Sequence, residues 1–205
     1  MRRRFIILFC TVLIFALTIT LPGQSINPVF AEDAAAHNHS PTECEAFVQN
    51  LVDQMTDKEK VGQLFIPGAT NAGSEPTEAE RERIQEFGYG GFIFSGLNDP
   101  RQAANYVNQL QEWAQDTRLG IPVFAASDME WGASHQFTEI GPEEGKPTPV
   151  PFPMGLGATR NVEHAGTAGR ITATEARAMG FTMNFAPVAD VNTNPNNPVI
   201  GVRSF

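Results

Sequence analysis

The stretch Ile121-Pro122-Val123-Phe124-Ala125-Ala126-Ser127-Asp128-Met129-Glu130-Trp131-Gly132 begins as an apolar run and ends abruptly at carboxylates. Such a run, opened by proline and closed by polar residues, is typical of a buried β-strand. A strand that ends on Asp128 places a charge at the rim of a sheet, where it needs water, a partner or a ligand. Binding sites of α/β folds lie at the carboxyl ends of parallel strands. Asp128 is therefore a candidate site residue, although the same aspartate could simply cap the next loop.

Strand and helix signals alternate along the rest of the chain. Capping residues precede the helical patterns, as in Asp99-Pro100 and in the capping boxes Thr42-x-x-Glu45 and Thr77-x-x-Glu80, and glycine follows them, as at Gly120. The pattern predicts strands at residues 64–66, 91–94, 121–128 and 181–188, a long loop over residues 131–153, and helices that begin near Thr42, Thr56, Thr77, Asp99 and Asn161. Strands separated by about a helix length indicate a parallel α/β fold.

Two parallel α/β architectures fit this alternation. A doubly wound, nucleotide-binding sheet needs a glycine-rich fingerprint directly after its first strand, and the segment from Pro67 to Gly73 lacks that spacing. A (β/α)₈ barrel needs eight strands and about 250 residues. This chain of 205 residues supplies strand signals for half of them. We therefore predict an α/β fold that is a partial TIM (β/α)₈ barrel, the first half only.

The composition indicates an acidic globular protein. An apolar share of 41% and a formal charge of -9 suit a domain with a sizeable core. A sequence pI near 4.9 argues against nucleic-acid binding, and solubility alone explains it. Cys10 lies in an apolar leader and Cys44 lies between two glutamates, so we expect neither an internal disulfide nor a reactive thiol. Nothing in the sequence suggests a metal or an organic cofactor, and we predict none.

The N-terminus has the pattern of a secretory signal peptide. Arginines precede a continuous apolar run from Phe5 to Leu21, and Val29-Phe30-Ala31 offers small residues to a signal peptidase. We predict a signal peptide over residues 1–31, cleaved after Ala31, a flexible lead-in over residues 32–41 and a globular segment over residues 42–205. The protein is then secreted or held in the cell envelope, and it meets a membrane only through the signal segment before cleavage. An uncleaved anchor is the alternative, since the apolar run is nearly long enough to span a bilayer.

Five blocks after residue 54 form an ordered series. They are Met55 to Leu64, Ser127 to Gly132, Pro151 to Thr159, Phe185 to Asn192 and Asn197 to Phe205. Together they resemble the catalytic barrel domain of glycoside hydrolase family 3, whose third-strand motif is usually Asp-x-Glu-Gly-Gly. The ending Arg203-Ser204-Phe205 is more similar to the β-N-acetylhexosaminidase branch than to the β-glucosidase branch. Residues 42–205 would then be the N-terminal part of a family 3 catalytic domain, and we expect more of that domain beyond residue 205.

This resemblance implies a retaining glycosidase that acts on terminal β-linked sugars. An aspartate nucleophile in such enzymes forms a covalent glycosyl intermediate that water then releases. Asp128 matches the family's aspartate that binds sugar hydroxyls, and Arg203 matches an arginine that contacts the same sugar. We predict both as substrate-binding residues. The family's Lys-His pair, its nucleophile and its His-Asp acid/base loop would lie beyond residue 205, so we assign no catalytic residue and no metal ligand here.

Several residues near these positions depart from the family pattern or have open roles. Trp131 stands where the family has glycine, and it could either stack on a sugar face or pack the loop. His135 does not match the family's histidine and is interpreted as a loop residue. We expect Glu130 to brace the pocket rather than react, and Asp190 to tie its loop to the barrel.

Two classes of function follow from the sequence. The first is a secreted, exo-acting, retaining glycosidase that releases a terminal β-linked sugar, N-acetylglucosamine in our interpretation, with this chain as a fragment that is inactive alone. A β-glucosidase of the same family is the alternative within this class. The second class is a catalytically inactive sugar-binding or structural module. The predicted partner is a carbohydrate substrate, and the missing phosphate-binding loop disfavours a nucleotide-dependent enzyme.

Overall fold

The computed structural model of the chain describes residues 40–70, 75–137 and 145–205. These residues fall into two units, one ending at Thr56 and the other running from Asp57 to Phe205, and each is described by itself. The predicted signal peptide and most of the predicted lead-in lie outside the described residues. Within the described ranges, no helix is both long and apolar enough to cross a bilayer.

The first unit contains the helix α2 (Pro41–Gln54), which begins at a capping box. The Glu43 amide donates to the Ser40 hydroxyl at 3.3 Å, and the Ser40 amide donates to the Glu43 carboxylate at 2.7 Å. The sequence predicted this start near Thr42, with Thr42 and Glu45 as the capping pair. The earlier pair forms instead because proline suits the first helical position, which places the cap at Ser40.

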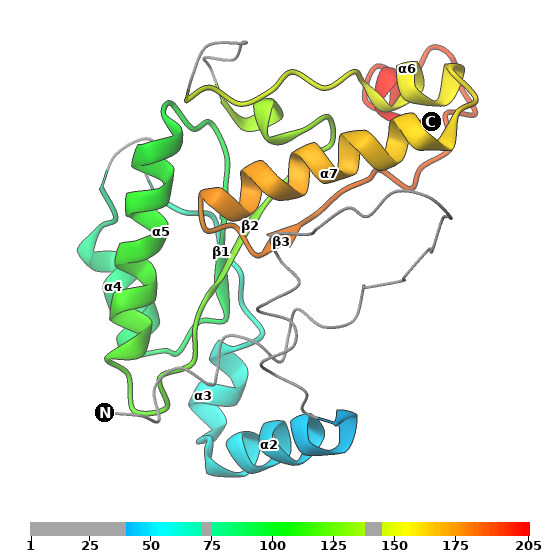
Figure 1. Cartoon of the computed structure of the whole chain (residues 1–205). Helices are drawn as coiled ribbons and strands as arrows, with labels where there is room; N and C mark the ends of the chain where they lie inside the picture. Colours follow the sequence, from blue (N-terminus) through cyan, green and yellow to red (C-terminus); the bar gives the residue numbers. More distant parts are fainter. Residues whose placement is uncertain (1–39, 71–74, 138–144) are drawn as a thin grey trace, which may run out of the picture. The chain divides into compact units, whose positions relative to one another are not determined.

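The second unit is built on a parallel sheet (Figure 1). Its strands, in spatial order, are β1 (Gly91–Phe94), β2 (Phe124–Ser127) and β3 (Met183–Asn184). Phe94 is in register with Ser127, and Ser127 is in register with Asn184. The three strands therefore end together, and Asp128 follows β2 directly at their carboxyl edge.

A further segment lies along the other side of β1. The Ile93 amide donates to the Pro67 carbonyl at 2.9 Å, and the Ala69 amide donates to the Ile93 carbonyl at 2.8 Å. The sequence predicted this strand at residues 64–66, which is wrong in position. The amides of Leu64 and Phe65 are already used, because they donate to carbonyls at the end of helix α3 (Asp57–Gly62). This segment therefore pairs with β1 only at Gly68, which forms a single parallel bridge with Ile93.

Helices connect the strands. They are α3 (Asp57–Gly62), α4 (Glu78–Gln85), α5 (Pro100–Gln115), α6 (Pro153–Ala158) and α7 (Val162–Ala178), with short 3-10 helices η1 (Ala133–Gln136) and η2 (Gly201–Arg203). The predicted caps of α5 and α7 are confirmed, since Asp99 accepts from the Arg101 amide at 2.7 Å and Asn161 accepts from the Glu163 amide at 3.0 Å. The predicted loop over residues 131–153 contains η1 and the first residue of α6, which are too short to show a helical period.

This order confirms the predicted parallel α/β fold. Helices α5 and α7 lie in the crossovers from β1 to β2 and from β2 to β3. Sequential parallel strands joined by helices are how a (β/α)₈ barrel begins. The described strands account for part of such a barrel, as the sequence predicted.

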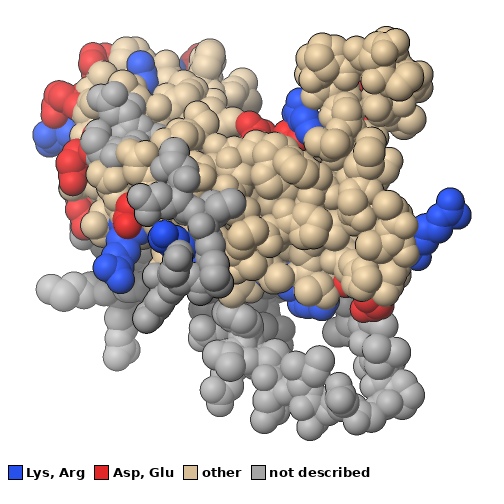
Figure 2. Space-filling view, turned by 90° about the horizontal axis from the view of Figure 1, so that it is seen from above, with Lys and Arg blue, Asp and Glu red and all other residues tan. Residues whose placement is uncertain are grey.

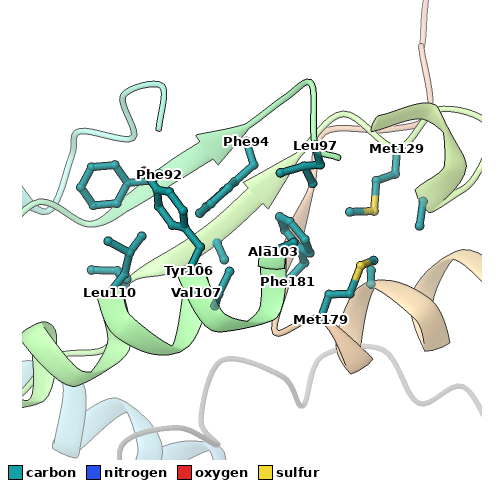
Figure 3. Close-up of a cluster of buried hydrophobic side chains, with 14 of the residues drawn as sticks. Phe92, Phe94, Leu97, Ala103, Tyr106, Val107, Leu110, Met129, Met179 and Phe181 are labelled. Carbon is teal, nitrogen blue, oxygen red and sulfur yellow. The ribbon is translucent and has the colours of Figure 1, made fainter. Parts of the chain in front are cut away.

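The hydrophobic core of this unit lies between the sheet and α5 (Figure 3). Figure 3 shows Tyr106 and Leu110 of α5 facing Phe92 and Phe94 of β1. The Phe94 ring meets the rings of Tyr106 and Phe181 edge to face, with both centroid distances at 5.3 Å. Burying each such side chain stabilises the fold by about 1.5–3 kcal/mol. This packing holds β1 and β2 rigidly under the site at their carboxyl ends.

A buried carboxylate joins α4 to α5. Glu80 is 0% exposed and accepts hydrogen bonds from the Tyr106 hydroxyl at 2.6 Å and from the Thr70 and Thr77 amides, each at 2.7 Å. The sequence predicted the capping box of Thr77 and Glu80, which is confirmed, but not the bond to Tyr106. Burial first, and the hydrogen bond to Glu80 second, raise the pKa of Tyr106 above its usual range.

Candidate functional site

The carboxyl end of β2 carries the predicted site residues Asp128 and Glu130. Main-chain pairing with the neighbouring strand β3 reaches as far as the Ser127 carbonyl, which accepts from the Phe185 amide at 3.0 Å. Beyond that point the polar groups of the main chain are bonded by side chains. Asn184 accepts from the Met129 amide at 2.9 Å. The turn after β2 is therefore held by residues distant in sequence.

Glu130 and Arg203 form a two-point ion pair. Arg203 Nε lies 2.7 Å from Glu130 Oε2, and Arg203 Nη2 lies 2.7 Å from Glu130 Oε1. The Glu130 side chain is 5% exposed, whereas the Arg203 side chain is 34% exposed. Paired forks of this kind fix the plane of the guanidinium. Arg203 Nη1 also donates to the Val199 carbonyl at 3.1 Å. The guanidinium is therefore held on both sides and remains partly exposed to solvent.

The charges of this pair stabilise each other. The hydrogen bonds from Arg203 hold the pKa of Glu130 below its usual range, although burial opposes this shift. The bonds to Glu130 raise the pKa of Arg203 in turn. Glu130 therefore stays ionised and hydrogen-bonded, which agrees with its expected bracing role and leaves it poorly placed to transfer a proton.

Asp128 is half-buried and lies in the same electrostatic neighbourhood. Its charge contributes to the raised pKa of Arg203, after the larger effects of Glu130 and Asp190. Among residues of the described ranges, none donates a hydrogen bond to its carboxylate. The charges of Asp128 and Arg203 therefore act on each other although the two residues are 75 positions apart in the chain (203 − 128).

Aromatic side chains cover one side of the turn. The Trp131 ring stacks on His135, with centroids 3.5 Å apart and planes 30° apart, and it meets the Phe152 ring at 4.7 Å. Of the two roles left open for Trp131, the structure shows loop packing. His135 lies in η1, and burial lowers its pKa more than the neighbouring carboxylates raise it. Phe152, at 45% exposed, is the member of this cluster that faces solvent.

The loop that carries Asp190 is tied down by its main chain. The Ser204 hydroxyl, in a residue that is 4% exposed, donates to the Asp190 carbonyl at 3.0 Å. The expected tie therefore exists, but it uses a peptide oxygen and not the Asp190 carboxylate. Ser204 had no distinguishing signal in the sequence, because a serine that bonds a distant carbonyl resembles any other serine.

The charged groups gather where the strands end. Strand β2 runs toward the top of Figure 1, and Figure 2 shows the molecule from that side. In this view, red and blue atoms meet beside a notch in the surface (Figure 2).

A separate cavity of about 80 Å³ lies at the other end of β2, where Glu59, Arg118 and Val123 contribute to its lining. No group of three or more His, Cys, Asp or Glu residues suited to a metal ion is found within residues 40–70, 75–137 and 145–205.

Comparison with known proteins decides what this arrangement belongs to. Residues 56–205 match the family described as "Glycosyl hydrolase family 3 N terminal domain". The chain belongs to glycosyl hydrolase family 3. This membership confirms the resemblance found in the sequence motifs, and it confirms a TIM-barrel-like α/β fold of which the described strands form part.

Relatives within glycosyl hydrolase family 3 carry two kinds of description. A periplasmic beta-glucosidase of Salmonella typhimurium is 33% identical over 174 residues, which cover 83% of this chain and 20% of that protein. Beta-hexosaminidase A of Pseudoalteromonas piscicida is 36% identical over 129 residues, or 60% of this chain and 21% of that protein. This chain therefore spans only about a fifth of the length of these relatives.

A solved structure supports the same family. It is a glycoside hydrolase family 3 beta-N-acetylglucosaminidase from Paenibacillus sp. str. FPU-7, with a TM-score of 0.64 and 38% sequence identity. The match covers 73% of this chain and 27% of that chain.

Proposed function

We propose that the protein is an exo-acting, retaining glycosidase for terminal β-linked sugars, in which this chain supplies part of the sugar-binding pocket. Family membership supports a glycosidase. The observation that carries the proposal is a guanidinium that Glu130 orients at the carboxyl end of β2, in the electrostatic neighbourhood of the half-buried Asp128. The two oxygens of a carboxylate can accept hydrogen bonds from adjacent sugar hydroxyls, and a planar guanidinium can donate hydrogen bonds to sugar oxygens. Asp128 and Arg203 are the proposed substrate-binding residues.

The catalytic groups are not assigned to the described residues. A retaining mechanism needs a carboxylate nucleophile and an acid/base near the scissile bond. Glu130 is committed to Arg203, and His135 is stacked on Trp131, so neither fits these roles. The proposal places the nucleophile and the acid/base in other segments of the whole protein and predicts no hydrolysis by residues 1–205 alone.

N-acetylglucosamine is the proposed sugar. The two relatives described as acting on amino sugars, beta-hexosaminidase A and the beta-N-acetylglucosaminidase, are 36% and 38% identical to this chain. The Salmonella beta-glucosidase, at 33% identity over a longer stretch, favours glucose as the second candidate. Both sugars present neighbouring equatorial hydroxyls to Asp128, so this residue does not separate them.

Export from the cytoplasm is part of the proposal. The basic start and apolar run of residues 1–31 have the composition of a signal peptide, and the Salmonella relative is described as periplasmic. The protein is then secreted or held in the cell envelope. N-terminal sequencing of the mature protein should begin at Glu32, and a mature chain that begins at Met1 would contradict cleavage.

A hydrolysis assay tests the proposed function. The protein expressed from the entire coding region of its gene should hydrolyse a chromogenic N-acetylglucosaminide faster than the corresponding glucoside. Asp128→Ala should lower kcat/KM by at least about 100-fold, because contacts that strengthen in the transition state are lost. Asp116→Ala is the matched control, since Asp116 is exposed at the end of α5.

The outcomes separate the parts of this proposal. If neither substrate is hydrolysed, the glycosidase assignment is wrong. If the glucoside is preferred, the sugar assignment is wrong but the enzyme class stands. Hydrolysis by the Asp128→Ala variant at the rate of Asp116→Ala removes Asp128 from the pocket.

A further inference from the structure

We propose that Gln136 and Asn184 are positioning residues whose side-chain amides hold the main chain of residues 128–130 from two sides. These bonds thereby fix the positions of the Asp128 carboxylate and of the ion pair between Glu130 and Arg203. This inference rests on the proposed function, because the quantity it concerns is the alignment of those groups with a sugar.

The inference begins from three consecutive residues whose main-chain groups are bonded by side chains. Gln136 Nε2 donates to the Asp128 carbonyl, and Asn184 Oδ1 accepts from the Met129 amide at 2.9 Å. The Glu130 amide lies 3.4 Å from His135 Nδ1. Met129 is 2% exposed, so its amide has no access to solvent in place of Asn184. A buried peptide group without a partner is costly, and such side-chain bonds therefore fix the main chain firmly.

Each amide is itself anchored to a neighbour of β2. The Gln136 carbonyl accepts from the Leu97 amide at 2.7 Å, and a parallel bridge joins Leu97 to Phe137, just beyond β1. Asn184 belongs to β3, where it is in register with Ser127. The two amides thus tie the turn after β2 to the strands on both sides. A displacement of either neighbour is passed to the Asp128 carboxylate through these bonds.

The two bonds have opposite polarity, which makes them separable by substitution. Gln136 donates a proton through its nitrogen, so glutamate, which is isosteric but ionised, cannot replace it. Asn184 accepts through its oxygen, so aspartate can replace it, whereas leucine of similar size cannot. A structural role that depended only on shape would not distinguish these variants.

The amino end of the same strand provides a matched control. Gln111 of α5 donates to the Val123 carbonyl at 2.8 Å and accepts from the Val123 amide at 3.2 Å. This is also a side-chain amide bonded to the main chain beside β2, but it lies at the end away from Asp128. Gln111→Leu should therefore weaken the fold without moving the site.

The experiment compares these variants in the protein expressed from the entire coding region. We expect Gln136→Glu and Asn184→Leu to lower kcat/KM for the chromogenic N-acetylglucosaminide roughly 10-fold to 100-fold, since small misplacements of binding groups have effects of this size. Asn184→Asp should retain at least about tenfold more activity than Asn184→Leu. Gln111→Leu should lower the melting temperature but change kcat/KM by no more than about twofold.

Two kinetic results would overturn the inference. One is a kcat/KM for Gln136→Glu that equals that of Gln111→Leu at the same folded fraction. The other is an Asn184→Asp variant as impaired as Asn184→Leu.

Amide hydrogen exchange at Met129 keeps failure of this inference separate from failure of the proposed function. Asn184→Leu should speed exchange of the Met129 amide at least tenfold relative to Asn184→Asp, whatever the protein catalyses. If the wild-type protein hydrolyses neither substrate, the catalytic consequence falls with the proposed function, while faster Met129 exchange still verifies the bond. If the Met129 amide exchanges at the same rate in Asn184→Leu as in Asn184→Asp, the Asn184 side chain does not hold the main chain, and the inference is wrong.

Discussion

Two buried glutamates, Glu80 and Glu130, satisfy their oxygens in different ways. Glu80 is fully enclosed and is bonded by a tyrosine hydroxyl and main-chain amides, which carry no formal charge. The Glu130 side chain is 5% exposed and is bonded by the guanidinium of Arg203, which is 34% exposed. One carboxylate therefore faces only the interior of the fold, and the other holds a cation at the surface.

The two glutamates therefore have different roles. Neutral donors from Thr70, Thr77 and Tyr106 join Glu80 to neighbouring segments of the same fold, so its contribution is to stability. Arg203 is held by Glu130 in a fixed plane with an edge toward solvent, so the same type of bond contributes to a binding surface. Burial of a carboxylate alone does not identify a site, whereas burial combined with an exposed, oriented partner does.

Glu80→Ala should have the largest effect on this comparison. The substitution removes the acceptor of the Thr70 and Thr77 amides and leaves the Tyr106 hydroxyl with only the Thr70 carbonyl, so we expect the free energy of unfolding to fall by about 3 kcal/mol. Urea denaturation measures this change. Glu82→Ala on the exposed face of the same helix is the control and should change stability by less than about 0.5 kcal/mol. Equal stabilities of the two variants would contradict a structural role for Glu80.

Glu130→Gln should affect catalysis more than stability. The amide cannot accept both guanidinium bonds, so Arg203 loses its orientation, and kcat/KM of the whole protein should fall about 10-fold to 100-fold, or about 1.4–2.7 kcal/mol. Kinetic assays at matched folded fractions check this, with the exposed Glu163→Gln as control. If the variant unfolds like Glu80→Ala but keeps its kcat/KM, the distinction between the two glutamates fails.

The contacts of the two glutamates should also lose their stabilising effect at different pH values. On the alkaline side, the group concerned is Tyr106, which donates a hydrogen bond to Glu80. Burial raises the pKa of Tyr106 above its ordinary value near 10, so the unfolded chain loses this proton before the folded one does. Stability is fully present below pH 10 and falls above it, by as much as about 1.4 kcal/mol per pH unit. Tyr106→Phe should remove this component of the alkaline loss. Denaturation midpoints between pH 9 and pH 11 measure it, and parallel curves for both proteins would contradict it.

The acid side should show the smallest effect. Hydrogen bonds from Arg203 lower the pKa of Glu130, so its ion pair stabilises the fold above the ordinary glutamate pKa and is lost as pH falls through the folded value. We expect a contribution of at most about 1 kcal/mol, because solvent screens the partly exposed arginine. In Glu130→Gln, the free energy of unfolding should depend less on pH below about pH 4.5 than it does in the wild type. An equal dependence in both proteins would show that the ion pair does not stabilise the fold.

Much of the fold was predictable because its signals are local. The capping box of Thr77 and Glu80 and the cap at Asp99 depend on residues within one turn of each helix, and both were found in the sequence. The strand at residues 91–94 was predicted at its observed bounds. The strand predicted at residues 64–66 failed, because the end of α3 claimed the amides of Leu64 and Phe65. An apolar run records a preference for burial and not which hydrogen bonds its amides make.

The candidate site was predictable only in part. Asp128 and Arg203 stood out through motifs that resemble a known family, and the structure shows them in one neighbourhood. Gln136, Asn184 and Ser204 carried no signal, since each acts by bonding a main-chain group far along the chain. Their roles depend on the strand register that brings them there.

The alternation of strands and helices, the helix caps and the carboxylate at the end of β2 can be read from the amino-acid sequence, because they follow from periodicity and from neighbours a few residues away. The contacts of Glu130 with Arg203 and of Tyr106 with Glu80 exist only in the folded chain. Such contacts close long loops, and their free energy depends on the packing of every element between the two residues. Side chains of the same type can therefore stabilise a core or orient a site, according to where the fold places their partners.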